Sequence, residues 1–287
     1  MEYLIAVAET GSFSRAAESL NVSQPGLSQQ IKQLEREIGA VLVERLPRLA
    51  CLTPAGRAFL PDARRAVTAA RQAKRAAVAT DTGSGDLEIA TVLSVAAGVL
   101  PASVAEWNKR APGATIRLFE YTHADRLAKD VANGVADLAV GPTPVGWEGP
   151  VVPLGAEEFV VVLPPHDPVA EHGGVIDLEM LADRSWVLFD RQNGLSDIVE
   201  GLCRAAGFVP RGVLHTTQIS AGVRLAAAGL GPMIIPDNVV PPELRAPVMR
   251  LRKPFRRPLS VYARMTFSPL AQGYVDVLRN TPLRLTK

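Results

Sequence analysis

The sequence predicts an α/β protein with a helical N-terminal segment, one long connecting helix, and a larger C-terminal part of alternating strands and helices. Three observations support this fold class. Two short amphipathic helices with a tight turn fit residues 11–35, helical spacing of apolar residues continues through 57–80, and short apolar runs alternate with helical patterns from residue 87 onward.

The first helix of the N-terminal pair is expected over residues 15–20. Ser12 or Ser14 can cap it, because either hydroxyl can accept a hydrogen bond from the amides of the first turn. Asn21 suits the turn that follows, since a short polar side chain tolerates a left-handed backbone.

The second helix of the pair has one apolar and one polar face. Ser23 caps it, and Pro25 lies in its first turn, where the missing N–H removes no helical hydrogen bond. At about 100° per residue, one side is apolar through Leu27, Ile31, Leu34 and Ile38. The other side suits the base edges and phosphates of a DNA major groove, through Gln24, Pro25, Ser28, Gln29, Lys32 and Arg36. A solvated helical hairpin is the alternative, but the agreement of cap, turn, proline and polar face favours DNA recognition.

A hairpin, or wing, is expected next, with strands at 41–45 and 51–53. Its tip is poor in basic residues, since Arg45 and Arg48 are the two basic residues that the sequence places there. We therefore expect weak contact between the wing and DNA. Thr53 lies at the start of the helix that follows.

Two motifs flank this hairpin. Ser23-Gln24-Pro25-Gly26-Leu27-Ser28 and Leu52-Thr53-Pro54-Ala55-Gly56-Arg57 are similar to the SQPALS and LTxAGR runs of the LysR-type transcriptional regulators. The resemblance covers essentially the whole chain. With the residue pattern, it points to DNA contacts from Ser12, Arg15, Ser23, Gln24, Pro25, Ser28, Gln29, Lys32, Arg36, Arg45, Arg48 and Thr53. Gly26 stands where relatives usually have Ala, and Gln29 where many have Arg, so their base preference does not transfer to this chain.

Residues 57–80 are expected to form one helix with the a/d spacing of a coiled coil, or a surface helix packed on its own domain. The resemblance implies a linker helix that pairs two subunits in a homodimer or homotetramer. We expect a winged helix-turn-helix at 1–57, the linker at 58–80, a hinge at 81–86 and an effector-binding domain at 87–287. By the resemblance that domain has two lobes, like a periplasmic binding protein: lobe I at 87–160 and 266–287, and lobe II at 161–265.

The C-terminal part supplies the elements of such a domain. Strands are expected at 87–91, 115–121, 138–140, 159–163, 186–189, 213–216, 233–235 and 259–263. Helices are expected at 95–110, 124–133, 196–206, 219–228 and 269–279. The resemblance places the two lobe crossings near 159–163 and 259–263.

An effector is expected in the cleft, where strand ends and helix N-termini meet. The predicted contacts are Ser94, Val95, His123, Thr143, Arg191, Thr216, Thr217 and Gln218. Ser94 ranks first, because its hydroxyl and the following amides can hold an anion, although helix capping explains a Ser or Thr equally well. The family makes a small carboxylate or aromatic acid plausible as the inducer.

Composition and charge limit the other function classes. The net charge is +2, and residues 1–57 hold six basic and six acidic side chains, so the head has no broad basic patch. No run reaches the length of a membrane span and no signal peptide is evident, so we expect a cytoplasmic protein with Cys51 and Cys203 as free thiols. The four histidines show no metal-ligand spacing, and no nucleophile elbow or phosphate loop is found, so we expect neither an enzyme nor a cofactor.

The resulting expectation is a regulator that binds an interrupted palindrome in double-stranded DNA, responds to a small-molecule inducer and contacts RNA polymerase. The alternative is a small-molecule binding or transport protein, which the C-terminal part alone would suggest. The N-terminal motif argues against that alternative.

Overall fold

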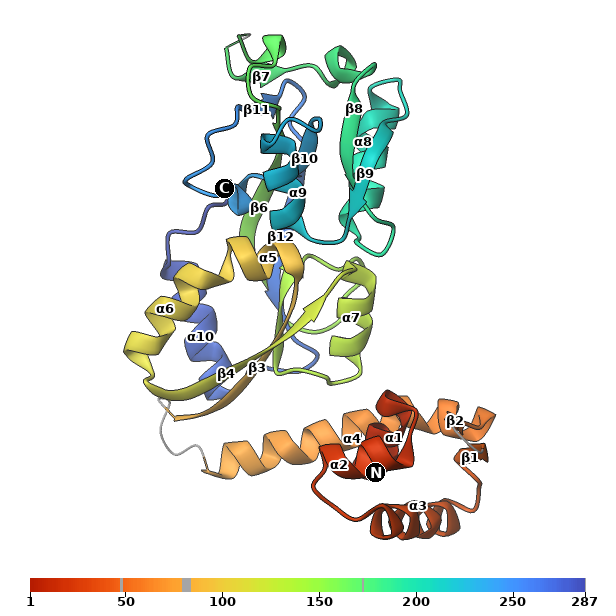
Figure 1. The fold of residues 1–287 in the computed structure, drawn as a ribbon. Helices are drawn as coiled ribbons and strands as arrows, with labels where there is room; N and C mark the ends of the chain where they lie inside the picture. Colours follow the sequence, from red (N-terminus) through yellow and green to blue (C-terminus); the bar gives the residue numbers. More distant parts are fainter. Residues whose placement is uncertain (47–48, 79–83, 172, 287) are drawn as a thin grey trace. The chain divides into compact units, whose positions relative to one another are not determined.

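The computed structural model (Figure 1) describes residues 1–46, 49–78, 84–171 and 173–286, and the chain divides into two compact units. The elements of the first unit are α1 (Glu2–Thr10), α2 (Phe13–Ser19), α3 (Gln24–Ile38), β1 (Val43–Leu46), β2 (Leu49–Leu52) and α4 (Pro54–Val78). This order confirms the predicted helix pair, hairpin and long helix.

Capping residues set the limits of the first helices. The Ser12 hydroxyl accepts from the Arg15 amide at the start of α2, and the Ser23 hydroxyl accepts from the Gly26 amide, 3.2 Å away, at the start of α3. Asn21 has the left-handed backbone predicted for the turn, with φ 52°. Gly39 ends α3 with φ 75°, a conformation that glycine adopts without steric cost.

The core of this unit joins α1, α2, α3 and the hairpin. Its buried side chains are Leu4, Ala6, Val7, Ala16, Ala17, Leu27, Ile31, Leu42 and Val43. The Glu35 carboxylate accepts from the amides of Leu42 and Val43, at 2.8 and 3.1 Å, and so ties α3 to β1. Ile38 was expected in the apolar stripe, but it is 43% exposed because α3 ends there and extends past the core.

α4 begins at Pro54, directly after Thr53, where the start of this helix was expected. Thr53 is its N-cap, because the Thr53 hydroxyl accepts from the Gly56 amide at 2.9 Å. Gly56 permits close packing, since a Cβ there would lie 2.1 Å from the Leu42 carbonyl oxygen. Of the predicted hinge, residues 81–83 lie outside the described residues, and residues 84–86 belong to strand β3 instead.

The second unit contains a mixed eight-stranded sheet and a separate pair of strands. Its strands are β3 (Ser84–Val92), β4 (Gly113–Tyr121), β5 (Leu138–Pro142), β6 (Val151–Val162), β7 (Val175–Ile176), β8 (Ser185–Phe189), β9 (Arg211–Thr216), β10 (Met233–Pro236), β11 (Val248–Leu251) and β12 (Arg256–Tyr262). The order is β4-β3-β5-β12-β6-β11-β7 with β10 also paired to β6, while β8 pairs with β9 in parallel. β7 and β11 were not predicted, because such short strands carry little periodic signal.

Helices pack around these strands. They are α5 (Leu93–Gly98), α6 (Leu100–Arg110), α7 (Ala124–Ala132), α8 (Leu195–Ala205), α9 (Ile219–Ala227) and α10 (Pro269–Asn280), with 3-10 turns η1 (Pro168–Glu171), η2 (Leu178–Leu181) and η3 (Asp237–Val239). The prediction of a single helix at 95–110 is wrong, because two helices lie there. The chain breaks at Val99, since Pro101 lacks the N–H that a continuous helix would need and instead occupies the first turn of α6.

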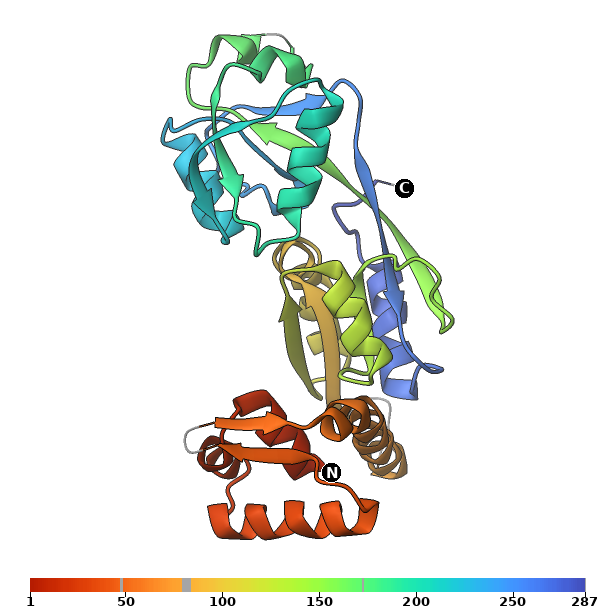
Figure 2. The same cartoon turned by 90° about the vertical axis from the view of Figure 1, so that its right-hand side faces the viewer.

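Two strands connect the lobes of the second unit. The first part of β6 pairs with β12, whereas its last residues pair with β10 and β11. Figure 2 shows β6 and β12 side by side along this crossing. β12 also pairs with β5 from Leu259 onward, so the return runs along β12, which overlaps the predicted 259–263. We therefore propose that lobe I holds β3–β5, the first part of β6, β12 and α10, and that lobe II lies between the crossings.

Each lobe has its own apolar core. That of lobe I includes the fully buried Ile89, Leu127, Val140 and Tyr274. That of lobe II is centred on Phe159, Val161, Trp186 and Cys203. Among the described residues, no helix is long and apolar enough to cross a membrane, and no group of three His, Cys, Asp or Glu is placed to hold a metal ion.

Candidate DNA interface and effector pocket

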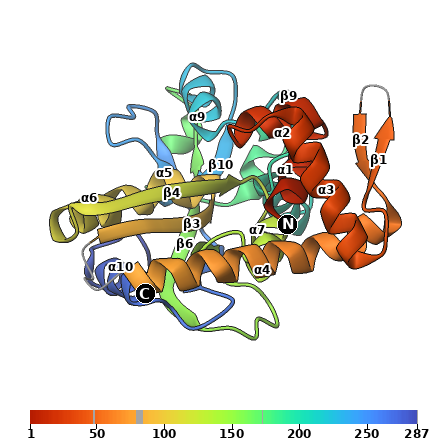
Figure 3. The same ribbon diagram turned by 90° about the horizontal axis from the view of Figure 1, so that it is seen from below.

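The outer face of α3 presents the polar residues that the sequence predicted. Gln24, Pro25, Gln29, Lys32 and Arg36 are exposed, and Ser28 is half-buried. Leu27 and Ile31 on the opposite face are fixed in the core, which sets the rotation of the helix. In Figure 3, α3 lies beside α1 and the β1–β2 hairpin follows it.

Local hydrogen bonds leave two side chains on this face available. Gln24 accepts from the Ser14 hydroxyl at 3.3 Å, and Arg36 donates to the Lys32 carbonyl oxygen at 3.3 Å. Neither the amide group of Gln29 nor the ammonium of Lys32 makes a hydrogen bond or ion pair within the described part of the chain. A free amide suits a base edge, and a free ammonium suits a phosphate.

The other predicted DNA contacts differ in their exposure. Ser12 caps α2, and Arg15 is exposed and donates to the Thr10 carbonyl oxygen. The predicted DNA contact of Thr53 is corrected by the structure. Thr53 is 8% exposed, and its hydroxyl donates to the Val41 carbonyl oxygen at 2.7 Å while it caps α4. Thr53 is therefore structural and has no free group for DNA. Arg48 and the side chain of Arg45 lie outside the described residues.

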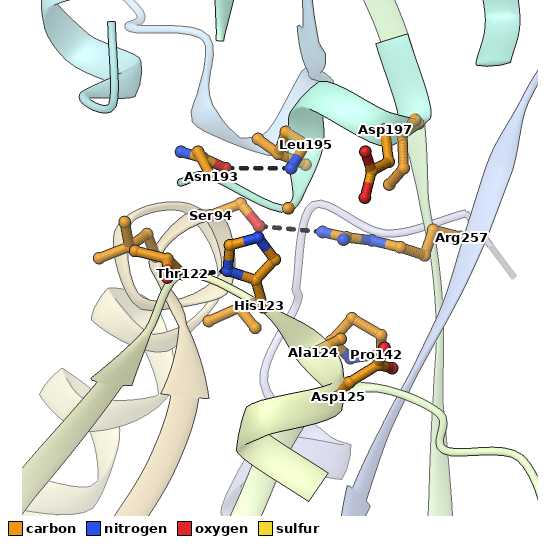
Figure 4. Close-up of a pocket in the computed structure, with 14 residues that line it drawn as sticks. Ser94, Thr122, His123, Ala124, Asp125, Pro142, Asn193, Leu195, Asp197 and Arg257 are labelled. Carbon is orange, nitrogen blue, oxygen red and sulfur yellow. Dashed lines mark hydrogen bonds between the residues drawn. The ribbon is translucent and has the colours of Figure 1, made fainter. Parts of the chain in front are cut away.

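A cavity of about 230 Å³ lies between the two lobes of the second unit. Its polar lining comes from Ser94, Thr122, His123, Asp125, Asn193, Asp197 and Arg257 (Figure 4). Ser94 lies in the first turn of α5, Asp125 in the first turn of α7, Asp197 in the first turn of α8, and Arg257 on β12. Three helix starts and a crossing strand therefore meet at this cavity.

The lobes touch directly beside the cavity. The Gly194 amide of lobe II donates to the Thr122 carbonyl oxygen of lobe I at 2.9 Å. A Cβ on Gly194 would lie 3.1 Å from that oxygen, so glycine permits the approach. The preceding Asn193 is 2% exposed and shapes the turn, because its Oδ1 accepts from the Leu195 amide at 3.0 Å and its Nδ2 donates to the Thr217 carbonyl oxygen at 2.9 Å.

Arg257 links the cavity to a buried carboxylate in the crossing. Its guanidinium donates to Glu157, which is fully buried, and its Nη2 donates to the Ser94 hydroxyl at 3.0 Å. The same guanidinium lies 5.7 Å from the centre of the Phe159 ring. Glu157 also accepts from Asn238 Nδ2 at 3.1 Å. Burial raises the pKa of Glu157, while the charge of Arg257 opposes that rise.

Two of the predicted effector residues line this cavity, namely Ser94 and His123. Val95 does not, because it is fully buried in the core of lobe I. Thr143 bonds Ser260 through their hydroxyl groups at 2.6 Å, and Arg191 is exposed outside the lining.

The loop before α9 was also expected at the cavity, but its residues are not among those that line it, so their contact with an effector stays a prediction. Thr216, Thr217 and Gln218 form a local turn, in which the Thr216 hydroxyl accepts from the Gln218 amide at 3.1 Å. The wall that faces lobe I is the start of α8, since the cavity is lined by Asn193, Gly194, Leu195, Asp197 and Ile198. Both loops precede a helix and carry polar residues, so sequence pattern alone does not distinguish them.

Five polar lining residues were missed: Thr122, Asp125, Asn193, Asp197 and Arg257. The two aspartates resemble ordinary first-turn acids of helices, which are common because they favour the helix dipole. Arg257 lies in a basic run near a crossing strand, and nothing local marks it. An available signal was Asn193-Gly194, a turn pair directly before a predicted helix.

Comparison with known proteins identifies the family of both parts of the chain. Residues 1–57 match the model of the bacterial regulatory helix-turn-helix proteins of the lysR family, and residues 80–282 match the LysR substrate binding domain. A probable hydrogen peroxide-inducible genes activator of Mycobacterium avium is 36% identical over 244 residues, which cover 83% of this chain and 77% of that protein. The regulator ClcR of Pseudomonas putida is 31% identical over 242 residues, which cover 83% and 82% of the two chains.

Solved structures extend the comparison to the whole fold. CbnR, a LysR family transcriptional regulator, has a TM-score of 0.67 and 26% identity, with 96% of each chain covered. A complex of full-length CbnR with its target DNA has 28% identity and a TM-score of 0.54, with 97% of this chain and 96% of that chain covered. A full-length OxyR variant from Pseudomonas aeruginosa shares the fold, with a TM-score of 0.75 at 23% identity over 100% of this chain and 96% of that one. The chain belongs to the LysR family of DNA-binding transcriptional regulators, which respond to an effector bound in the second domain.

Proposed function

We propose that this protein reads a promoter with the outer face of α3. Gln29 contacts a base edge in the major groove, and Lys32 contacts a phosphate. The observation that carries this proposal is that both side chains are exposed on a helix whose rotation is fixed by Leu27 and Ile31, and that neither is bonded within the described part of the chain. Ser12, Arg15, Ser23, Gln24, Pro25, Ser28 and Arg36 supply the surrounding contacts.

The active form is a homodimer or homotetramer in which α4 pairs two subunits. Two copies of α3 then reach two half-sites of an interrupted palindrome, about 34 Å apart or a multiple of that distance. α4 is 25 residues long, which suits a paired helix. We propose that the protein acts in the cytoplasm and regulates transcription through contact with RNA polymerase. No catalytic step is proposed, since the named relatives are regulators.

The effector binds the cavity between the lobes and includes a carboxylate. Arg257 and Ser94 are the groups that suit such an anion. Ligand binding changes the balance between two lobe arrangements, because a ligand shifts an equilibrium by its difference in affinity for the two states. Subunit packing and DNA bending then change, and transcription follows.

Selection of bound fragments from the source genome tests the proposal. Purified full-length protein is mixed with sheared genomic DNA, and the retained fragments are sequenced. We expect enrichment of an interrupted palindrome beside a divergent gene, and loss of that enrichment in a Gln29→Ala, Lys32→Ala double variant. Ser94→Ala, which alters the cavity, serves as the control and retains the site. An oligomeric protein that enriches no sequence would contradict the proposal and favour a small-molecule binding protein.

A further inference from the structure

The lining of the cavity carries more negative than positive charge. Arg257 is its strong cation, but this guanidinium is already paired with the buried carboxylate of Glu157. Asp125 and Asp197 are exposed, and neither forms an ion pair within the described ranges. A fully anionic effector would therefore meet two uncompensated carboxylates, which disfavours it.

The two aspartates come from opposite sides of the cavity. Asp125 belongs to α7 of lobe I, and Asp197 belongs to α8 of lobe II. Figure 4 shows them on opposite sides of the Arg257 guanidinium. First-turn acids stabilise helices, which explains each residue separately. That role does not explain why both line one cavity beside the contact between Gly194 and Thr122.

The cavity also keeps donors for an anionic group. Nη1 of Arg257 makes no hydrogen bond within the described residues, because the bonds to Glu157 and Ser94 use Nε and Nη2. Ser94 is 2% exposed and accepts from Arg257, but its own hydroxyl hydrogen has no acceptor in the described part of the chain. A buried donor without an acceptor costs free energy, and a ligand oxygen would relieve that cost.

We infer that the effector of this protein is a small zwitterion, with its carboxylate on Arg257 and Ser94 and its ammonium group in the part of the cavity that Asp125 and Asp197 line. This inference rests on the proposed function, because it specifies the ligand class for the same cavity. The ammonium group faces carboxylates that come from both lobes. It therefore offsets negative charge on both sides of the cavity and favours the closed lobe arrangement.

Four probes with the same number of carbon atoms separate the charge classes: 4-aminobutyrate, butylamine, butyrate and succinate. Binding to the full-length protein is measured by ligand-observed NMR at millimolar concentrations. We expect 4-aminobutyrate to bind most tightly and succinate most weakly. Asp125→Asn and Asp197→Asn should each lower the affinity for 4-aminobutyrate by about threefold, and the double variant should lower it by about tenfold.

Asp183→Asn is the matched control, because Asp183 is an exposed carboxylate of lobe II outside the cavity. This variant keeps the affinity of the native protein. Binding of butyrate is expected to be unchanged or stronger in the double variant, since a repulsive charge is removed. That gain distinguishes a direct charge effect from unfolding.

Three outcomes would overturn the inference: tighter binding of succinate or butyrate than of 4-aminobutyrate, unchanged 4-aminobutyrate affinity in the double variant, or no binding of 4-aminobutyrate at all. DNA selection with the same variants shows whether only the ligand class is wrong or whether the proposed regulator function is wrong as well. Retained palindrome selection together with anion binding would leave the regulator intact and overturn the zwitterion.

Discussion

The outer face of α3 and the cavity between the lobes are built in opposite ways. The face of α3 comes from one continuous segment, with side chains that are mostly exposed. The cavity is assembled from segments 163 residues apart, as in the bond between Ser94 and Arg257, and a buried ion pair lies behind it. Substitutions on the face of α3 should therefore leave the fold intact, whereas substitution of Arg257 should affect binding and stability together.

The largest expected effect comes from Arg257→Ala. This change leaves Glu157 buried without its cation, so we expect a loss of about 3–5 kcal/mol in the free energy of unfolding at neutral pH. Chemical denaturation checks it. Arg252→Ala is the control, because its pair with Asp177 is exposed and contributes about 0–1 kcal/mol. A loss as small as that of the control would mean that the buried pair does not support the cavity.

The pH dependence of this loss has a definite sign. Burial raises the pKa of Glu157 from its ordinary value of 4.5, so the folded state holds the proton more tightly than the unfolded state. The stability that this provides is present at low pH and is lost as pH rises through the folded pKa. Removing Arg257 raises that pKa further. The deficit of the variant should therefore be largest at neutral pH and should shrink as the solution is acidified toward pH 4.5.

The difference between the two regions also explains what the sequence could predict. Ser23, Pro25 and Gln29 belong to one helix and its cap, where spacing alone assigns each residue to a face. Asn193 and Arg257 meet Ser94 through the crossing of β6 and β12, which no local pattern encodes. The loop at 216–218 also carries polar residues before a helix, but it does not line the cavity. Thr53 matched the family motif, yet its hydroxyl is used within the fold.

The next largest effect is expected from Gln29→Ala on α3. This change should lower discrimination at one base pair in each half-site by about 1–3 kcal/mol. Selection from randomised half-sites measures the preference, and thermal unfolding should show little change because Gln29 is exposed. If the variant selects the same half-site sequence as the native protein, Gln29 does not contact a base.

A smaller effect is expected from Lys32→Ala. Because a phosphate contact carries no sequence information, the variant should bind all sequences more weakly and equally. The slope of log affinity against log salt should become shallower by about 1 for each phosphate that the variant no longer neutralises. Titration of specific and nonspecific duplexes at several salt concentrations measures both quantities. Weakening confined to the specific duplex would instead make Lys32 a base reader.

The smallest effect on DNA binding is expected from peroxide acting on Cys203. This expectation is not obvious, because a relative of this chain is named as a probable activator of hydrogen peroxide-inducible genes. Cys203 is fully buried in lobe II, and burial raises the pKa of its thiol to about 12. At pH 7 roughly one thiol in 10⁵ is then ionised, and the thiolate is the reactive form. Cys51 is partly exposed and belongs to the other unit.

We therefore expect the native protein to show one rapidly reacting thiol in a disulfide-exchange assay and two in denaturant. Peroxide should leave DNA binding unchanged in both the native protein and Cys203→Ala. Rapid peroxide oxidation at Cys203 would contradict this, because it would require lobe II to open and expose its core. Such opening would also mean that the cavity beside α8 is far less rigid than the bonds of Asn193 indicate.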